Sequence, residues 1–180
     1  MDIKNLRINY QKSKIDFQDL SETPIPFFLN WFEDALKVNK EANACVLSTV
    51  SYDNKPSSRV VLVKSVNDKG FTFFTNYKSS KAIDIEKNTH VALNFYWPIL
   101  ERQVRISGIV NKISTDDSDI YFTSRPRESQ VGAWVSQQSK SISLYYEFKN
   151  ILNKFESKFK GKVITRPLHW GGYCVEPNRI

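Results

Sequence analysis

The amino-acid sequence predicts a mainly β protein, an antiparallel barrel or curled sheet of six strands with helices packed outside it. Three observations carry this prediction. Apolar and polar residues alternate through much of the chain, which is typical of half-buried strands. Short turn sequences rich in Asn, Asp, Gly and Pro join successive strands, as antiparallel neighbours require. The 180 residues, 41% of them hydrophobic, suffice for one core without a metal or a disulfide.

The N-terminal half is predicted to contain two helices and three strands. Residues 1–20 are polar and of mixed charge, and we expect them to form a loosely held arm. A helix should follow, because Thr23 can cap it, prolines fall in its first turn and apolar side chains recur at helical spacing. From Asn43 the apolar period changes to two. The predicted ranges are a helix over 24–40, strands over 43–51, 58–66 and 70–76, and a helix over 79–88 with Ser79 as its cap.

The C-terminal half is predicted to add three strands and three helices. Within one strand, Val104 and Ile106 share a face while Gln103 and Arg105 point the other way. Acidic residues after Ser114 mark a helix start, where the helix dipole favours carboxylates. The predicted ranges are strands over 90–97, 101–113 and 170–176, and helices over 116–124, 127–135 and 141–160.

The charge balance favours anionic partners. A net charge of +7 and a pI near 9.3 fit nucleic acid, a membrane surface or a phosphorylated small molecule. Many basic residues fall in the last predicted helix, where we favour a solvated helix face over a nucleic-acid stripe. Apolar runs are far shorter than the roughly 20 residues of a membrane span, and the charged N-terminus lacks a secretory signal. We therefore expect a cytoplasmic protein with no membrane partner.

Cysteine and histidine residues give little support for a metal site. Cys45 and Cys174 lie in apolar, strand-like settings where reduced thiols act as small core side chains, so no disulfide is implied. His90 and His169 stand outside any zinc-binding spacing. Neither a nucleophile–histidine arrangement nor a close carboxylate pair is evident. If the protein is an enzyme, we expect a cofactor to carry the reaction.

Residues 59–64 (RVVLVK) form an apolar strand between two cations. Five residues apart on a strand, Arg59 and Lys64 face opposite sides and lie about 16 Å apart, so they cannot grip one anion unless a bulge intervenes. Each could meet a different part of an extended ligand, or both could merely flank a core strand. The pattern alone favours the second interpretation.

Residues 76–81 (NYKSSK) join a strand to a helix start. Free backbone N–H groups, two hydroxyls and Lys81 would form a phosphate cradle. An ordinary serine cap at Ser79 explains the same residues equally well.

Residues 121–129 (YFTSRPRES) contain a second set of groups suited to a phosphate. Tyr121 and Arg125 share one helical face, and Ser129 lies just beyond the break that Pro126 imposes. A ring, a guanidinium and a hydroxyl would suit an aromatic phosphate. The alternative is a helix end with a solvated arginine.

Two further segments embed polar groups in apolar surroundings, residues 100–104 (LERQV) and 132–139 (GAWVSQQS). Their amides and hydroxyls could bind the edge of a heterocycle or satisfy loop backbone. Taken in order, all these segments resemble the pyridoxine (pyridoxamine) 5′-phosphate oxidase family over nearly the whole chain. The motifs that carry the resemblance are residues 59–64, 74–76, 100–104, 124–130, 132–136, 138–139 and 170–172.

The resemblance implies an FMN-binding split β-barrel that works as a homodimer, with two flavins at the subunit interface. It implies FMN-phosphate contacts from Arg59, Ser80 and Lys81. The residues implied to line the ribityl chain and the flavin ring are Val60, Val61, Leu62, Val63, Lys64, Phe74, Thr75, Gln103, Gln138, Ser139 and Trp170.

The resemblance also implies a B6-phosphate substrate and oxygen as acceptor. Hydride transfer to the flavin would oxidise pyridoxamine or pyridoxine 5′-phosphate, and reoxidation by oxygen would release hydrogen peroxide. The implied substrate-phosphate residues are Lys64, Tyr121, Arg125 and Ser129, and the implied covering arm contains Arg7, Ile8, Asn9 and Tyr10. No individual catalytic residue is assigned.

Two departures from the family pattern shape the expectations. Ser80 stands where the family usually has an arginine, so we expect weaker retention of FMN. The sequence ends at Ile180, whereas family members continue to further arginine and histidine residues of the site. We therefore expect an oxidase with an arm over residues 1–20 and an FMN-binding domain over 21–180. The alternatives are a barrel that binds FMN or pyridoxal phosphate without turnover, and a basic nucleic-acid-binding barrel.

Overall fold

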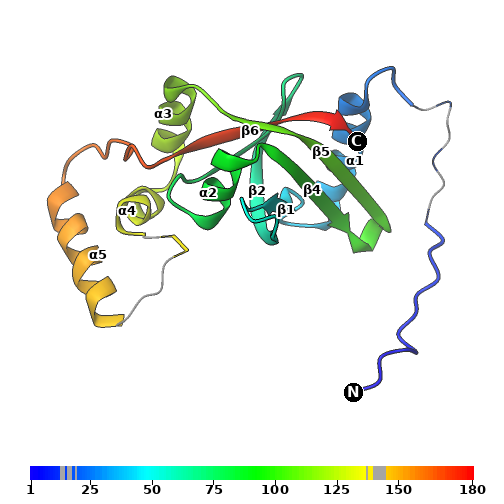
Figure 1. Ribbon diagram of the computed structural model, residues 1–180, viewed down its shortest axis with the longest axis horizontal. Coiled ribbons are helices and arrows are strands. Elements are labelled where there is room, and N and C mark those ends of the chain that lie inside the picture. Colours follow the sequence, from blue (N-terminus) through cyan, green and yellow to red (C-terminus); the bar gives the residue numbers. More distant parts are fainter. Residues whose placement is uncertain (13–14, 16–17, 19, 137, 140–144) are drawn as a thin grey trace.

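The structure is a computed structural model that describes residues 1–12, 15, 18, 20–136, 138–139 and 145–180. Six antiparallel strands close into a barrel in the order β1-β2-β3-β6-β5-β4 (Figure 1). The predicted antiparallel barrel with helices outside it is confirmed. The last strand, β6, closes the barrel by inserting between β3 and β5.

Every predicted helix and strand is present, with small shifts of their ends. The strand β6 is three residues longer than predicted, and β2 begins two residues earlier. Residues 141–144 of the last predicted helix lie outside the described residues. The elements are α1 Pro24–Val38, β1 Ala44–Val50, β2 Pro56–Asn67, β3 Gly70–Asn76, α2 Ser80–Lys87, β4 His90–Trp97, the 3-10 helix η2 Pro98–Leu100, β5 Arg102–Lys112, α3 Thr115–Ser124, α4 Arg127–Val135, α5 Tyr145–Phe159 and β6 Trp170–Arg179.

Strand alternation divides the barrel into an inner core and an outer face. Phe28 of α1 contacts this core edge-on, with its ring centroid 4.9 Å from that of Phe71 and 5.1 Å from that of Phe95. A second, smaller core lies among α3, α4, α5 and the start of β6, where Phe122 and Trp170 are buried. The residues that line the candidate functional site, described below, lie between these two cores.

The strand β2 contains a bulge near its end. Val63 pairs with Phe73 of β3 and Ser65 pairs with Thr72, so Lys64 is the extra residue between two successive pairs. The turn that follows requires Gly70, because its φ of +131° is one that glycine adopts readily. A Cβ at this position would also lie only 2.0 Å from the Val175 carbonyl oxygen. These two features fix how β2 and β3 meet.

The predicted caps need correction. Thr23 and Ser79 hold the N-cap positions of α1 and α2, but neither side chain makes a capping hydrogen bond. Ser114 does cap α3, because its hydroxyl accepts the backbone N–H of Asp117 at 3.0 Å. None of the helices within the described ranges has the length and apolar character needed to span a bilayer.

Candidate active site

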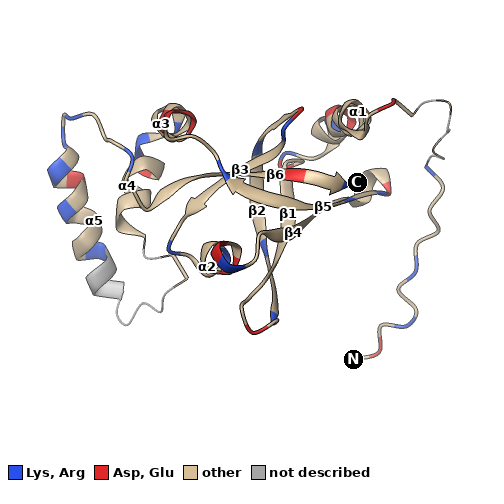
Figure 2. Ribbon diagram, turned by 45° about the horizontal axis from the view of Figure 1, so that its top comes forward, with Lys and Arg blue, Asp and Glu red and all other residues tan. Residues whose placement is uncertain are grey.

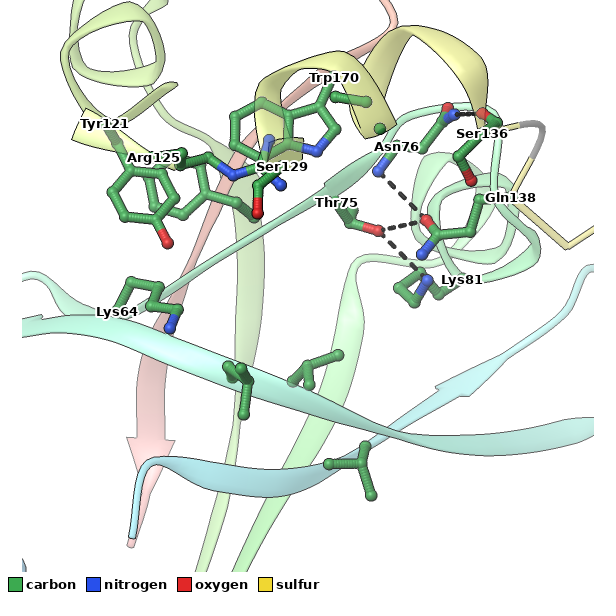
Figure 3. Close-up of a pocket in the computed structure, with 16 residues that line it drawn as sticks. Lys64, Thr75, Asn76, Lys81, Tyr121, Arg125, Ser129, Ser136, Gln138 and Trp170 are labelled. Atoms are coloured by element: carbon green, nitrogen blue, oxygen red, sulfur yellow. Dashed lines mark hydrogen bonds between the residues drawn. The ribbon is translucent and has the colours of Figure 1, made fainter. Parts of the chain in front are cut away.

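A cavity of about 430 Å³ lies between the outer face of β2, the end of β3 and the helices α3 and α4 (Figure 3). Cations stand at both ends of it and aromatic rings at its side. Its lining residues are Val60, Val61, Leu62, Lys64, Phe74, Thr75, Asn76, Lys81, Tyr121, Arg125, Ser129, Gly132, Ala133, Ser136, Gln138 and Trp170.

One end of the cavity contains Lys81, a buried cation without an acidic partner. Its side chain is only 7% exposed, and its Nζ donates to the hydroxyls of Thr75 and Ser79 at 3.2 and 3.3 Å. Burial, with a smaller effect from the nearby Arg59 guanidinium, lowers the pKa of Lys81 to about 8. Among the described residues Lys81 forms no ion pair, so this end of the cavity suits an anion.

Two backbone segments meet at the Lys81 end. The Gln138 Oε1 accepts the Thr75 hydroxyl at 3.0 Å and the Asn76 backbone N–H at 3.3 Å. The Asn76 Nδ2 in turn donates to the Ser136 carbonyl at 3.1 Å. Figure 3 shows this chain of contacts running from Lys81 through Thr75 to Gln138. The end of β3 and the segment after α4 are thereby held together beside Lys81.

The other end of the cavity contains Lys64 of β2, Tyr121 of α3, Arg125 from the junction of α3 and α4, and Ser129 of α4. Among the described residues, the buried Nη1 of Arg125 has no hydrogen-bond partner. Burial lowers the pKa of Arg125, and burial likewise raises the pKa of the Tyr121 hydroxyl. A buried guanidinium nitrogen without an acceptor is costly, so this end also suits an anion that accepts hydrogen bonds.

Three aromatic rings form a parallel wall between the two ends. The ring centroid of Phe74 lies 3.8 Å from that of Tyr121 and 5.4 Å from that of Trp170. The Arg125 guanidinium lies 4.5 Å from the centre of the Trp170 ring. Gly172 makes room for this wall, because a Cβ there would lie 2.8 Å from the Phe74 ring and 2.4 Å from Ile113. The rings cover part of one another's faces, and their remaining apolar surface borders the cavity.

Arg59 and Lys64 lie on opposite faces of β2, as the strand alternation predicts. Lys64 is exposed and lines the cavity, whereas Arg59 is half-buried on the inward face. The Arg59 Nη1 donates to the Thr49 hydroxyl at 2.7 Å, and its Nη2 lies 3.8 Å from the Asp84 carboxylate. Burial lowers the pKa of Arg59, an effect that Asp84 opposes. Lys64 is the extra residue of the bulge, and the bulge does not bring the two cations together.

Most of the residues predicted for the site line the cavity, and a minority lie elsewhere. Ser80 is exposed at the start of α2, and Ser139 is exposed with a left-handed φ of 67°. Gln103 lies on the outer face of β5 opposite Tyr96. The predicted residues outside the cavity lining are Arg7, Ile8, Asn9, Tyr10, Arg59, Val63, Ser80, Gln103 and Ser139.

The structure adds four residues to the predicted lining, namely Asn76, Gly132, Ala133 and Ser136. Asn76 is buried at the end of β3, where a polar residue at a strand-to-helix junction is the available sequence signal. Gly132 and Ala133 lie in α4, within the segment 132–139 that was predicted to contact a heterocycle, although neither residue was itself assigned to the site. Their contribution depends on the approach of α4 to β3, which no local pattern encodes.

Comparison with known proteins identifies the family. Residues 32–150 match the family model described as pyridoxamine 5′-phosphate oxidase. The pyridoxine/pyridoxamine 5′-phosphate oxidase of Cytophaga hutchinsonii is 45% identical over 177 residues, which cover 97% of this chain and 82% of that protein. The chain belongs to the pyridoxamine 5′-phosphate oxidase family. The enzyme of the same name from Leptospira interrogans is 44% identical over 179 residues, 99% of this chain and 84% of that protein.

Solved structures confirm the fold expected for this oxidase family. PhzG from Burkholderia lata 383, in complex with tetrahydrophenazine-1-carboxylic acid, superposes with a TM-score of 0.85 at 23% identity, covering 93% of this chain and 84% of that one. A pyridoxamine 5′-phosphate oxidase-related, FMN-binding protein from Nostoc punctiforme gives 0.67 at 15% identity, covering 88% and 83%. The predicted split-barrel class of the oxidase family therefore holds for this chain.

Proposed function

We propose that the protein is an FMN-dependent oxidase that converts pyridoxamine 5′-phosphate or pyridoxine 5′-phosphate to pyridoxal 5′-phosphate. Oxygen is the acceptor and hydrogen peroxide the second product. The observation that carries the proposal is the cavity with cations at both ends and a parallel aromatic wall between them. Family membership and the names of the relatives support the same reaction. In this proposal residues 21–180 form the FMN-binding domain, residues 1–20 form an arm, and the enzyme works in the cytoplasm.

The Lys81 end fits the phosphate of FMN. Within the described part of the chain the buried ammonium of Lys81 donates to two hydroxyls, and a phosphate would add the charge-assisted hydrogen bonds that replace its lost water. The Ser79 side chain does not cap α2, so the N–H groups of the first turn of this helix remain suited to phosphate oxygens. Arg59 lies close enough to lower the pKa of Lys81, and a shared dianion would relieve that repulsion. Ser80, at the first position of α2, adds a hydroxyl in place of a guanidinium.

The Lys64 end fits the phosphate of the substrate. Arg125 has a buried nitrogen without an acceptor, and Lys64 and Ser129 line the same end with donors that can turn toward an anion. Tyr121 adds a hydroxyl, and its ring is fixed against Phe74. Two separate cationic ends explain how one cavity accepts two phosphorylated ligands. The net positive charge of the protein favours the binding of these two anions.

The protein residues serve mainly to bind and orient. FMN, when bound, supplies an isoalloxazine ring that accepts a hydride from the carbon being oxidised. Val60, Leu62 and Trp170 would provide apolar surfaces against which the flavin and substrate rings could lie. The amide of Gln138, fixed by Thr75 and Asn76, keeps one N–H₂ group for a ring oxygen or nitrogen. Proximity and orientation are therefore the chain's own contribution.

The proposal includes a homodimer formed through the outer face of β2, β1, β4 and β5. Apolar side chains on this face are exposed, Val60 at 65% and Tyr96 at 51%, and the buried Asn94 Oδ1 finds no donor among the described residues. Val60 and Leu62 belong both to this face and to the cavity. A second copy on the face would therefore extend the cavity wall. The predicted site residue Gln103 lies on the same face.

The direct test combines a spectrum with a product assay. The purified protein, incubated with FMN and desalted, should be yellow, and it should release peroxide and pyridoxal 5′-phosphate from pyridoxamine 5′-phosphate under oxygen. Lys64→Ala should lower this turnover at limiting substrate, while Lys55→Ala, which changes an exposed hairpin lysine, should not. If the protein binds FMN but releases no peroxide at saturating FMN, its function is that of the non-catalytic binding protein and not of an oxidase. Nucleic-acid binding without flavin uptake would support the third alternative instead.

Nothing in the arrangement of charge favours that third alternative. Figure 2 shows lysine and arginine residues distributed over several elements, α2 and α5 among them, with acidic residues interspersed. On α5, side chains such as Phe155 and Phe159 pack against Trp134 of α4. The basic residues of α5 therefore lie on the solvated side of an amphipathic helix, as the sequence pattern predicts.

A further inference from the structure

The turn between β4 and β5 binds the N-terminal arm through the Glu101 carboxylate and the Ile99 carbonyl. The Glu101 Oε2 accepts the backbone N–H of Gln11 at 2.7 Å and that of Lys12 at 2.8 Å. The Lys12 Nζ donates back to the Ile99 carbonyl of the same turn at 2.6 Å. We call these three hydrogen bonds the clasp. Two of them involve an ionised acceptor and one an ionised donor, so each belongs to the stronger class of hydrogen bond.

The backbone at Glu101 shows that the residue is not an ordinary turn residue. It follows η2 in the left-handed conformation, with φ 55° and ψ 33°. Glycine adopts this conformation without cost and asparagine with little, whereas a glutamate there is strained. Strain at a side chain that makes specific contacts is a reason to look for a function of that side chain. The contacts here are those of the clasp.

The next residue performs a parallel task for the first helix. The Arg102 Nη1 pairs with the Asp34 carboxylate at 3.0 Å, and its guanidinium lies 4.7 Å from the centre of the Trp31 ring. Consecutive residues of one turn therefore hold the two N-terminal segments, Glu101 the arm and Arg102 α1. Glu101 and Arg102 do not line the cavity, and these contacts explain why the segment 100–104 contains them.

The clasp sets the arm beside the outer face that borders the cavity. The Tyr10 hydroxyl lies 3.4 Å from the Tyr96 hydroxyl on β4. Extending the β1–β4 register by two residues sets Tyr96 opposite Ala44, which pairs with Leu62 of the cavity lining. Two strand spacings separate Tyr96 from Leu62, about 10 Å. The three residues from Tyr10 back to Arg7 can span about the same distance.

We propose that Glu101 is the anchor of the N-terminal arm and a positioning residue for substrate binding. It acts through the arm, by fixing its root at residues 11–12 so that residues 7–10 are presented to a substrate in the cavity. The inference rests on the proposed function in taking the cavity to bind that substrate. Glu101 itself touches neither the cavity nor its ligands.

Amide hydrogen exchange tests the anchor without any turnover. In the wild-type protein the amides of Gln11 and Lys12 should exchange more slowly than those of residues 3–8. Glu101→Gly should abolish this protection while leaving the thermal midpoint unchanged or higher, because glycine relieves the left-handed strain. Glu101→Gln keeps one acceptor oxygen and should retain part of the protection. Glu41→Gln, an exposed acid outside the clasp, should change nothing. Equal exchange rates in the wild type and Glu101→Gly would overturn the anchor.

Kinetics with pyridoxamine 5′-phosphate test the positioning role. Glu101→Gly should raise KM several-fold with kcat and FMN affinity nearly unchanged, and Glu101→Gln should restore part of the loss. Because Glu101 acts through the arm, the effects of Glu101→Gly and Arg7→Ala should not add in the double variant. If the effects of the two substitutions on KM add, or if Glu101→Gly leaves KM unchanged although the Gln11 and Lys12 amides lose their protection from exchange, the clasp has a structural role only. If the wild type shows no turnover, the proposed function fails, and the exchange experiment still decides the anchor.

Discussion

The charged residues of the cavity differ in what their neighbours do to them. Among the described residues, Lys81 is buried with hydroxyl partners, Arg125 is half-buried with its buried Nη1 unpaired, and Lys64 is exposed. Alternation along β2 was enough to predict that Arg59 and Lys64 diverge, because the period of a strand is a local property. Sequence could not decide between a cap and a cradle at Ser79. That choice depends on the folded position of Lys81, toward which the Ser79 hydroxyl turns.

FMN binding should weaken as the pH rises through about 8. The pKa of Lys81 in the free protein is about 8, and a bound phosphate favours its charged form, so binding above this pH must take up a proton. The dissociation constant should then rise with pH, approaching about tenfold per pH unit. Titration of flavin fluorescence from about pH 7 to about pH 9.5 measures it. Lys81→Gln should bind more weakly and with no such slope.

Three single substitutions should separate the two phosphate sites. Lys64→Ala and Arg125→Ala each remove a charge-assisted hydrogen bond, and a loss of about 1.5–3 kcal/mol corresponds to a rise of roughly 10- to 100-fold in KM for pyridoxamine 5′-phosphate. Arg59→Ala should instead raise the dissociation constant of FMN more than it raises KM. Steady-state kinetics at saturating FMN, together with flavin titration, distinguishes the patterns. The same change in both constants for all three variants would show that the sites are assigned wrongly.

At the scale of elements, the aromatic wall forms where three elements pack closely against one another. Phe74 comes from β3, Tyr121 from α3 and Trp170 from the start of β6. Gly172 lies behind Phe74, where a Cβ would overlap both the ring and Ile113. The wall is therefore sensitive to a single added methyl group at Gly172.

Gly172→Ala should destabilise the fold by about 1–3 kcal/mol, the usual effect of overpacking. It should also weaken FMN and substrate binding, because the Phe74 ring must move. Urea unfolding followed by tryptophan fluorescence measures the first effect. The matched control is Gly132→Ala within α4, where a Cβ meets no atom within 4 Å and helix propensity favours alanine by about 1 kcal/mol. A stability loss of similar size in both variants would refute the packing argument.

The residue ranges of the helices and strands were largely predictable from the sequence, whereas the pairing of strands in the barrel was not. Turn residues and a change of apolar period delimit β1, β2 and β3 locally, so their ranges agree closely with the structure. The insertion of β6 between β3 and β5 depends on contacts across about a hundred residues. The family resemblance implies Gln103 and Gln138 together as flavin-lining residues, because a resemblance carries no distances between strands. The structure separates them onto the outer barrel face and the cavity.

At the scale of the whole molecule, the cavity and the uncovered barrel face share a border. Val60 and Leu62 belong to both, and the clasp holds the arm beside the same face at Tyr96. Burying exposed apolar side chains is the main favourable contribution to association. The proposed dimer would therefore complete the cavity and cover the face in one step.

Val46→Asp should convert the proposed dimer into a folded monomer with little affinity for FMN. Val46 lies on β1 between Val60 and Asn94, at the centre of the uncovered face, where an unpaired carboxylate would be buried on association. Sedimentation equilibrium and circular dichroism report mass and folding. Val163→Asp makes the same change at a side chain 84% exposed and away from that face, and it should leave the dimer intact. A wild-type protein that sediments as a monomer would contradict the dimer outright.

The bulge in β2 has a consequence for how the family's binding site could diversify. The extra residue uncouples the two ends of the strand, so changes at the outward position of Lys64 need not propagate into the β2–β3 hairpin. A deletion at residues 64–65 would restore a continuous ladder with the same partners beyond it, and it would remove the local bend that sets the position of Lys64. Insertions and deletions should therefore be tolerated at the hairpin tip after Asn67 and selected against at residues 64–65. Ligand preference at Lys64 can then evolve independently of barrel closure.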